Sequence, residues 1–410
     1  GEVGQTVVFD VNGKPQPPDP SQPFHGPGYK LDNPSRAGNC ATCHTPIAST
    51  APNMQNCTWS GCHTSSTIEH SNGILQQPAV PSVNLKGDAA EGISCEFCHK
   101  TFRVDVDPKT GLPYPDMPGI LSMELLRPQD DSQQVFFGTL VDVARTDSYL
   151  PLLSQSQFCA GCHYGVFGGV VGMQMVKDGT VIYNSYGEWL KSPYSNPDTG
   201  KTCQQCHMPI SDSNWFVFAA QGGLTRDNVQ LHDHTMLGTY SEKLLQNAVT
   251  MKTDAQRTDN QIQVQVSITN DQAGHDVPTD VPIRSVILVV EALDAKGNPL
   301  ALADGSVNPK FSGDYADLPG KTFAKVLRDE LTGEMPTAAF WRPVTIASDN
   351  RIAPLATDTS KYTFTLPTNE AVTINVKLIY RRAFYELMQQ KGWNDPDILM
   401  EHATVQLPAN

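Results

Sequence analysis

Five cysteine pairs, each followed directly by a histidine, constrain this chain more than any other feature of its sequence. Four pairs have two residues between the cysteines, and the fifth has four. The pairs use all ten cysteines of the chain and are Cys40–Cys43 with His44, Cys57–Cys62 with His63, Cys95–Cys98 with His99, Cys159–Cys162 with His163, and Cys203–Cys206 with His207. The repeated spacing is that of covalent c-type haem attachment, so the sequence predicts five c-type haems.

The chemistry of attachment explains this spacing. Two thiols three residues apart lie on one face of a helical turn, where both can add to the vinyl groups of a single porphyrin. The histidine that follows turns its imidazole toward the iron as the proximal ligand. The wide pair Cys57–Cys62 does not fit one regular turn, so we expect a small loop over residues 58–61.

Disulfides and zinc are the two alternative uses of paired cysteines. A disulfide framework does not require a histidine after the second cysteine of every pair. Zinc ribbons use Cys-x-x-Cys pairs but seldom need the trailing histidine. The pattern therefore favours haem.

Composition narrows the class of protein further. The net charge of −14 and the pI near 5.1 argue against nucleic acid as a partner. Hydrophobic residues make up 39%, and the 31 prolines and 31 glycines predict few long regular elements, so buried porphyrin is expected to replace part of the side-chain core. No apolar run is long enough for a transmembrane helix.

Export follows from the haem prediction, because haem is attached covalently outside the cytoplasm. The sequence starts without an apolar signal region. We therefore expect that a signal peptide has been removed and that the protein is extracellular, with the periplasm as the alternative.

The chain divides into three parts by composition. Residues 1–38 form a proline-rich arm, residues 39–258 carry the haem motifs, and residues 259–410 are rich in strand patterns. The predicted fold is a mostly irregular, short-helical, haem-packed domain followed by an antiparallel β-sandwich-like domain with one helix. Strands are expected at 261–268, 285–293, 321–328, 343–347, 361–366 and 371–378, and the helix at 381–390.

The haem-bearing part is expected to contain only short elements. Besides the motifs, short helices are predicted around 123–126 and 186–190, and a longer one over 241–253. A hairpin is predicted where residues 173–176 and 180–183 flank a Lys-Asp-Gly turn.

Six histidines remain after the five proximal ones, and they are candidates for the distal iron ligands. The sixth, His402, lies in the last predicted strand and is the spare; the candidate ligands are His25, His70, His232, His234 and His275. This near match favours bis-histidine ligation, which leaves the iron without an open position and suits outer-sphere electron transfer. Methionine is the competing ligand, with Met54, Met208 and Met236 nearest in sequence.

Each candidate has its own argument and an ordinary alternative. His232 and His234 alternate, so in an extended segment they point to opposite sides and reach two different haems; a zinc-binding His-x-His is the alternative. His275 lies in a tight Gly-His loop before Pro278, and the alternative is an ordinary loop histidine. His25, in the arm, is either a ligand or solvated, and His70 is seven residues beyond His63.

The order of these features resembles a known class. A proline-rich arm, a widened haem motif, a His-x-His segment, and a β-rich part that opens on Gly-His-x-x-Pro-Thr and reaches Leu-Ile-Tyr-Arg are similar to the multihaem c-type cytochromes of metal-reducing and related anaerobic microbes. Among them, the chain looks most like the extracellular cytochromes that polymerise into conductive filaments. The resemblance implies stacked haems in one path and a head-to-tail polymer, with copies of itself or other cytochromes as partners and His25 as the ligand donated across the interface.

Two classes of function follow. In the first, the protein is not an enzyme, and the haems carry electrons as a wire or a soluble shuttle. In the second, it is a redox enzyme similar to multihaem nitrite or hydroxylamine enzymes, with one five-coordinate haem. Pentahaem nitrite reductases use Cys-x-x-Cys-Lys at the catalytic haem, whereas every motif here ends in histidine, which favours electron transfer. A third possibility gives the β-rich part a binding partner and makes the haems a relay.

Overall fold

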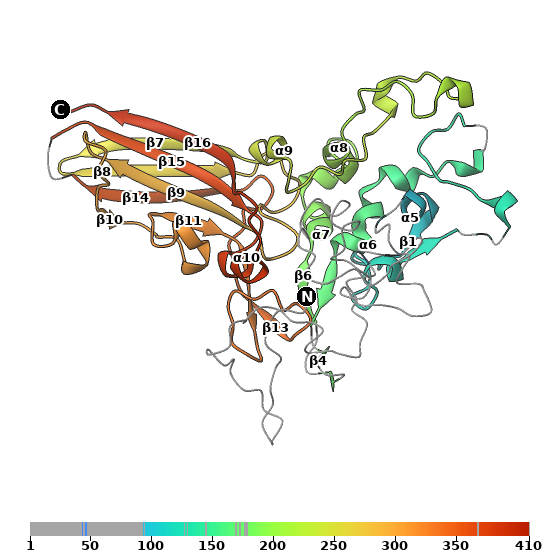
Figure 1. The fold of residues 1–410 in the computed structure, drawn as a ribbon, viewed down its shortest axis with the longest axis horizontal. Helices are drawn as coiled ribbons and strands as arrows, with labels where there is room; N and C mark the ends of the chain where they lie inside the picture. The colour runs from blue at the N-terminus through green and yellow to red at the C-terminus, as the bar shows by residue number, and fades with distance from the viewer. Residues whose placement is uncertain are drawn as a thin grey trace. The chain divides into compact units, whose positions relative to one another are not determined.

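The computed structural model describes residues 43, 46, 93, 95–126, 128, 130–143, 146–168, 170–171, 174–175, 179–366 and 369–409 (Figure 1). The described residues belong to two compact units. We call the unit that holds residues 167–183 and 242–409 the β-unit. The motif unit holds the described residues among 36–166 and 184–241.

Two four-stranded sheets make up most of the β-unit (Figure 1). The first has the order β10 (Leu302–Asp304), β14 (Thr357–Thr365), β8 (Gln261–Thr269) and β7 (Thr250–Thr258). The second has the order β11 (Gly320–Phe323), β9 (Ser285–Leu293), β15 (Val372–Arg381) and β16 (Ile398–Leu407). All neighbouring strands are antiparallel.

Side-chain alternation explains how these sheets pack. In β8 the apolar residues Ile262, Val264 and Val266 are buried while their neighbours face outward. They join one core cluster with residues of β9 and β15 from the other sheet, such as Leu288 and Ile374. The predictions of strands at 261–268 and 285–293 are confirmed by β8 and β9.

Strand β9 is buried on both faces because a second layer covers it. Leu288 points into the core between the sheets, while Ile287 and Val289 pack with Tyr315 on the opposite side. Tyr315 ends the 3-10 helix η10 (Lys310–Tyr315). The continuously apolar sequence of this strand therefore reflects burial on two sides.

Shorter elements complete the β-unit. Strands β12 (Lys325–Asp329) and β13 (Val344–Asp349) form an antiparallel pair. Helix α10 (Tyr385–Lys391) begins four residues later than the predicted helix over 381–390, because β15 extends to Arg381. It ends before Gly392, as predicted, and the φ of 64° at Gly392 lies in the left-handed region that favours glycine. Helix α9 (Glu242–Gln246) precedes β7.

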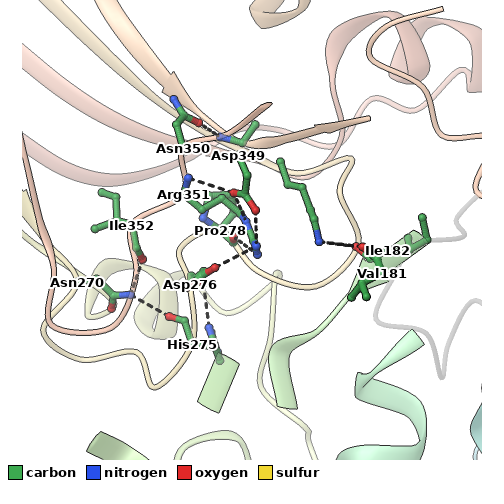
Figure 2. Close-up of polar contacts among 12 residues, drawn as sticks. Val181, Ile182, Asn270, His275, Asp276, Pro278, Asp349, Asn350, Arg351 and Ile352 are labelled. Carbon is green, nitrogen blue, oxygen red and sulfur yellow. Dashed lines mark hydrogen bonds and ion pairs between the residues drawn. The ribbon is translucent and has the colours of Figure 1, made fainter. Parts of the chain in front are cut away.

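The segment 179–183 of the β-unit is anchored by a buried lysine. Lys325, 5% exposed, donates from Nζ to the carbonyl oxygens of Val181 and Ile182 at 3.1 and 3.2 Å (Figure 2). The side chain of Ile182 packs against Leu327 and Val344. These contacts fix strand β6 (Thr180–Tyr183) within the β-unit.

The motif unit contains only short elements in its described residues. Its helices are α5 (Cys95–Lys100), α6 (Ala160–His163), α7 (Ser185–Leu190) and α8 (Cys203–His207); β1 (Thr101–Val104) pairs with β2 (Met123–Leu125), and β3 (Gly165–Phe167) begins in this unit. The 3-10 helices are η2 (Gly119–Ser122), η3 (Asp131–Gln133), η4 (Thr146–Ser148), η5 (Pro151–Ser154), η6 (Ser156–Cys159), η7 (Pro193–Ser195), η8 (Ala219–Gln221) and η9 (Asn228–Gln230). None of the helices in the described part of the chain has the length and apolar character needed to cross a bilayer.

Three local predictions are wrong. Residues 123–125 form strand β2 instead of a helix, because they pair with β1. The helix expected over 241–253 stops at Gln246, and β7 begins at Thr250. Strand β5 (Gln174–Met175) pairs with β4 (Val170–Val171), so these two residues do not form the expected hairpin with 180–183.

Candidate haem-binding site

Three cysteine motifs lie on short helices. In α5 and α8 the first cysteine starts the helix, and in α6 the helix begins one residue after Cys159 and ends at His163. Helix α8 is preceded by a capping box, in which Thr202 and Gln205 bond reciprocally to each other's backbone. The Thr-x-x-Gln spacing that signals this cap is present in the sequence.

Two polar side chains dock α8 against the segment before α6. The backbone N–H of Cys203 donates to Ser156 Oγ at 3.0 Å. The amide of Gln204, 8% exposed, donates to the carbonyls of Leu153 and Gln155 at 3.0 and 2.8 Å. Two motifs far apart in sequence are thereby held side by side.

The cysteine thiols converge as a result. Cys159 and Cys203 hydrogen-bond to each other, and so do Cys162 and Cys43. Cys98 is near enough to both members of the α6 motif to raise the pKa of each thiol. The attachment points of four motifs therefore lie together.

The thiols differ in acidity. The hydrogen bonds with Cys159 and Ser156 together lower the pKa of Cys203 to about 6, although burial opposes the shift. The same hydrogen bond with Cys203, together with burial, raises the pKa of Cys159. Burial raises the pKa of Cys98 to about 11. The thiolate is the nucleophile that adds to a vinyl group. Cys203 is therefore more readily available for this addition than Cys159.

Three histidines of the motif unit share one hydrogen-bonding arrangement. Nδ1 of His99 lies 2.6 Å from the Phe137 carbonyl oxygen, Nδ1 of His207 lies 2.5 Å from the Leu237 oxygen, and Nδ1 of His232 lies 2.7 Å from the Met208 oxygen. A carbonyl oxygen only accepts, so each Nδ1 must carry the proton. The lone pair of each neutral ring then lies on Nε2, which is the tautomer of a metal-binding histidine with its outer nitrogen held by the backbone.

His99 and His234 form a close pair. Their ring centroids are 6.1 Å apart and their planes are inclined by 35°. With a metal–nitrogen bond of about 2 Å and roughly 1.2 Å from a ring nitrogen to the ring centre, two imidazoles on opposite sides of one metal ion have centroids about 6.4 Å apart. The separation therefore has the size that two axial ligands of one iron require.

His275 is presented by a braced loop in the β-unit (Figure 2). Its Nδ1 donates to the Asp276 carbonyl oxygen at 3.0 Å, which again leaves the lone pair on Nε2. Buried Asn270 donates at 2.8 Å to the carbonyls of His275 and Ile352. Arg351 binds the carboxylate of Asp276 at 3.0 Å, so the loop is fixed at the histidine and at the residue after it.

The other predicted ligands are less informative. Nδ1 of His163 lies 3.5 Å from Ser185 Oγ, at the outer limit of a hydrogen bond. His402 is exposed on β16 and has its Nε2 3.5 Å from Thr404 Oγ, so it lacks the arrangement of the other four histidines. The remaining predicted site residues lie outside the described residues; they are His25, Cys40, His44, Cys57, Cys62, His63 and His70.

A zinc site at His232 and His234 gains no support from the structure. Within the described residues, no three His, Cys, Asp or Glu side chains converge on a position for one metal ion. The donors that are present, paired thiols on one helical face and imidazoles with the lone pair on Nε2, are those that c-type haem uses.

The fold is similar to that of a penta-haem cytochrome c552 from Thermochromatium tepidum. The TM-score is 0.56 and the identity 19%, over 90% of this chain and 83% of that one. Two further matches are the Fcho1 mu homology domain from Danio rerio with a bound Eps15 peptide (9% identity, 40% of this chain and 44% of that one) and the human F-spondin reeler domain (10%, 42% and 100%); both have a TM-score of 0.16 and carry no argument. No family model and no curated protein matches the sequence.

Proposed function

We propose that this protein is an electron-transfer cytochrome with five covalently attached c-type haems, each ligated by two histidines. The observation that carries the proposal is the His99–His234 pair at 6.1 Å, together with the Nδ1 bond that fixes the tautomer of His99. The predicted count of five haems equals that of the penta-haem cytochrome with the similar fold.

The chain's own residues have distinct roles in this proposal. The cysteines hold each porphyrin, and the histidine after each pair binds the iron, which supplies one-electron redox chemistry. His234 is the second ligand of the haem on Cys95 and Cys98. His232, two residues earlier, serves a different haem, and His275 on its braced loop is a further iron ligand. His25 and His70 complete the set.

Two axial imidazoles on every iron favour electron transfer over catalysis. A six-coordinate iron has no position for nitrite, hydroxylamine or another small substrate. The convergence of Cys43, Cys98, Cys159, Cys162 and Cys203 supports close packing of four haems, since each porphyrin is bound through its edge to these sulfur atoms. Short distances between porphyrin edges are required for electron transfer from one haem to the next.

The substitution His234→Ala tests the ligand assignment. In the haem-loaded protein we expect one low-spin signal to disappear from the oxidised electron paramagnetic resonance spectrum and one high-spin signal to appear. The reduced variant should bind carbon monoxide at that haem. The matched control is His402→Ala, which should leave all five haems low-spin. Unchanged spectra in His234→Ala would reject the assignment of His99 and His234 as the two ligands of one iron.

The same spectra of the unaltered protein separate electron transfer from catalysis. Five low-spin signals that do not respond to nitrite or hydroxylamine support a carrier. A high-spin haem that binds either molecule would support the enzyme alternative instead.

We further propose that the protein is extracellular and assembles head-to-tail with copies of itself into a filament. This proposal rests on the sequence, in which His25 lies in a proline-rich arm. The arm would donate His25 as an iron ligand to a neighbouring copy. In His25→Ala we expect five attached haems, one altered iron spectrum and no fibres by negative-stain microscopy. Fibres and an unchanged spectrum in the variant would reject His25 as the ligand donated across the interface. Absence of fibres from the unaltered protein would reject the filament and leave the soluble shuttle.

A further inference from the structure

Lys100 is a buried cation beside a predicted iron ligand. It follows His99 at the end of α5, and it is 1% exposed, which places it among the largest fully buried side chains of the described residues. Its Nζ lies 2.5 Å from Gln134 Oε1 and 4.3 Å from the centroid of the Phe136 ring. Lysine is seldom buried to this degree without a charged partner.

Both of these partners are neutral. The amide of Gln134 is oriented by its own hydrogen bond, because Nε2 donates to the Pro128 carbonyl at 2.5 Å and Oε1 is left to face the lysine. Among the side chains that the structure describes, which exclude those of Glu96 and Asp131, no carboxylate lies within ion-pair distance of Lys100. One hydrogen bond and one cation–π contact compensate a buried ammonium group only in part.

The segment that holds Lys100 also holds His99. The backbone N–H of Phe137 donates to the His99 carbonyl at 2.8 Å, and the Phe137 carbonyl accepts from His99 Nδ1 at 2.6 Å. Residues 134–137 therefore position the imidazole and the ammonium group together. The positive charge is fixed one residue from the side chain that binds iron.

We propose that Lys100 sets the reduction potential of the haem carried on Cys95 and Cys98, with that anionic cofactor as its counter-charge. The inference rests on the proposed function. Reduction adds one electron to the iron, and a nearby positive charge in a poorly solvated site stabilises the reduced form. Lys100 thus raises the potential of this haem relative to a site with a neutral residue.

The test is a spectroelectrochemical titration of the full, haem-loaded protein and its variants. In Lys100→Gln and Lys100→Met, one of the five potentials should fall and four should stay unchanged. Lys100→Arg should leave the reduction potential of this haem at its original value, since arginine keeps the positive charge. Lys109→Gln is the control, because Lys109 is exposed in the same unit.

A second variant neutralises the charge without removing the lysine. Gln134→Glu places a carboxylate against Nζ and should lower the same potential as Lys100→Gln. If all five potentials are unchanged in Lys100→Gln and Gln134→Glu while five low-spin haems remain, the proposal is overturned. A failure of the proposed function looks different, because the unaltered protein itself would then lack five low-spin, reducible haems.

Discussion

The β-unit and the motif unit bury their apolar residues on very different scales. In the β-unit one large cluster runs through both sheets and includes Val266, Leu288 and Ile374, each with no exposed surface. The main cluster of the motif unit is small, and two of the cysteines that would carry haem, Cys98 and Cys162, pack directly against it. The β-unit is therefore stabilised by its own side chains, whereas the core of the motif unit is built around the cysteines to which porphyrins would attach.

Production of the full chain without haem attachment should give the largest effect. We expect the motif unit to lose its fold, because its small side-chain cluster cannot offset the conformational entropy of so many irregular residues. The β-unit should keep its strands. Limited proteolysis with mass spectrometry should show cuts concentrated in 95–166 and 184–241, while circular dichroism retains a β signal. Equal protection of both units without haem would contradict the comparison.

A cavity in the β-unit core should have the next largest effect. Leu288 is 0% exposed in β9, so Leu288→Ala should lower the free energy of unfolding by about 2–5 kcal/mol. Urea denaturation followed by circular dichroism measures the change. The haem spectra in native buffer should be unchanged, since the cavity lies in the other unit's core. The control is Leu399→Ala on β16, where the side chain is 47% exposed and the cost should be small.

The strands of the β-unit could be predicted where their side chains alternate. The pattern of 261–268 and the apolar run of 285–293 give β8 and β9 directly, because burial sets the periodicity. Strand β7 was not predicted, because Thr250–Thr258 lies at a sheet edge and its half-buried face mixes apolar with polar residues, namely Met251, Thr253, Ala255 and Arg257. The leucines that precede β7, Leu244 and Leu245, suggested a helix over 241–253, whereas helix α9 ends at Gln246.

The attachment motifs could be predicted because haem chemistry fixes a local spacing. The pairing of His99 with His234 could not, since it depends on how two distant segments meet in space. The burial of Lys100 was also hidden, because a lysine at the end of a short helix is normally solvated. The sequence thus predicts which cofactor would bind, while the surroundings of each motif depend on tertiary contacts.

A pH effect in the β-unit should be smaller than the cavity effect. Burial raises the pKa of Glu334 to about 7, and Asp329 contributes, although Arg342 opposes the shift. The folded protein therefore holds a proton that the unfolded chain releases near pH 4.5, so stability should fall as pH rises from about 4.5 to 7. The expected loss is roughly 2 kcal/mol after allowance for partial exposure.

Glu334→Gln is the matched variant for this pH effect, because it keeps the shape and removes the titration. Urea unfolding of the β-unit signal at several pH values should show a shallower decline between pH 5 and 7.5 in the variant than in the unaltered protein. A decline of the same steepness in both proteins would assign the effect to another group.

Loss of the cap on α8 should have the smallest effect, and it bears most directly on what holds the motif unit together. The Thr202 side chain caps the helix, and its backbone N–H donates to Gln205 Oε1 at 2.7 Å. Removal of such a cap from an ordinary helix costs about 0.5–2 kcal/mol. In the haem-loaded protein, Thr202→Ala should cost less than about 1 kcal/mol, because two thioether bonds and an iron ligand fix the same turn. Urea unfolding at the Soret band measures it, with Thr199→Ala as the control. A larger loss would mean that the side chains of the motif unit contribute to its stability as strongly as the haem does. The motif unit and the β-unit would then differ only in degree.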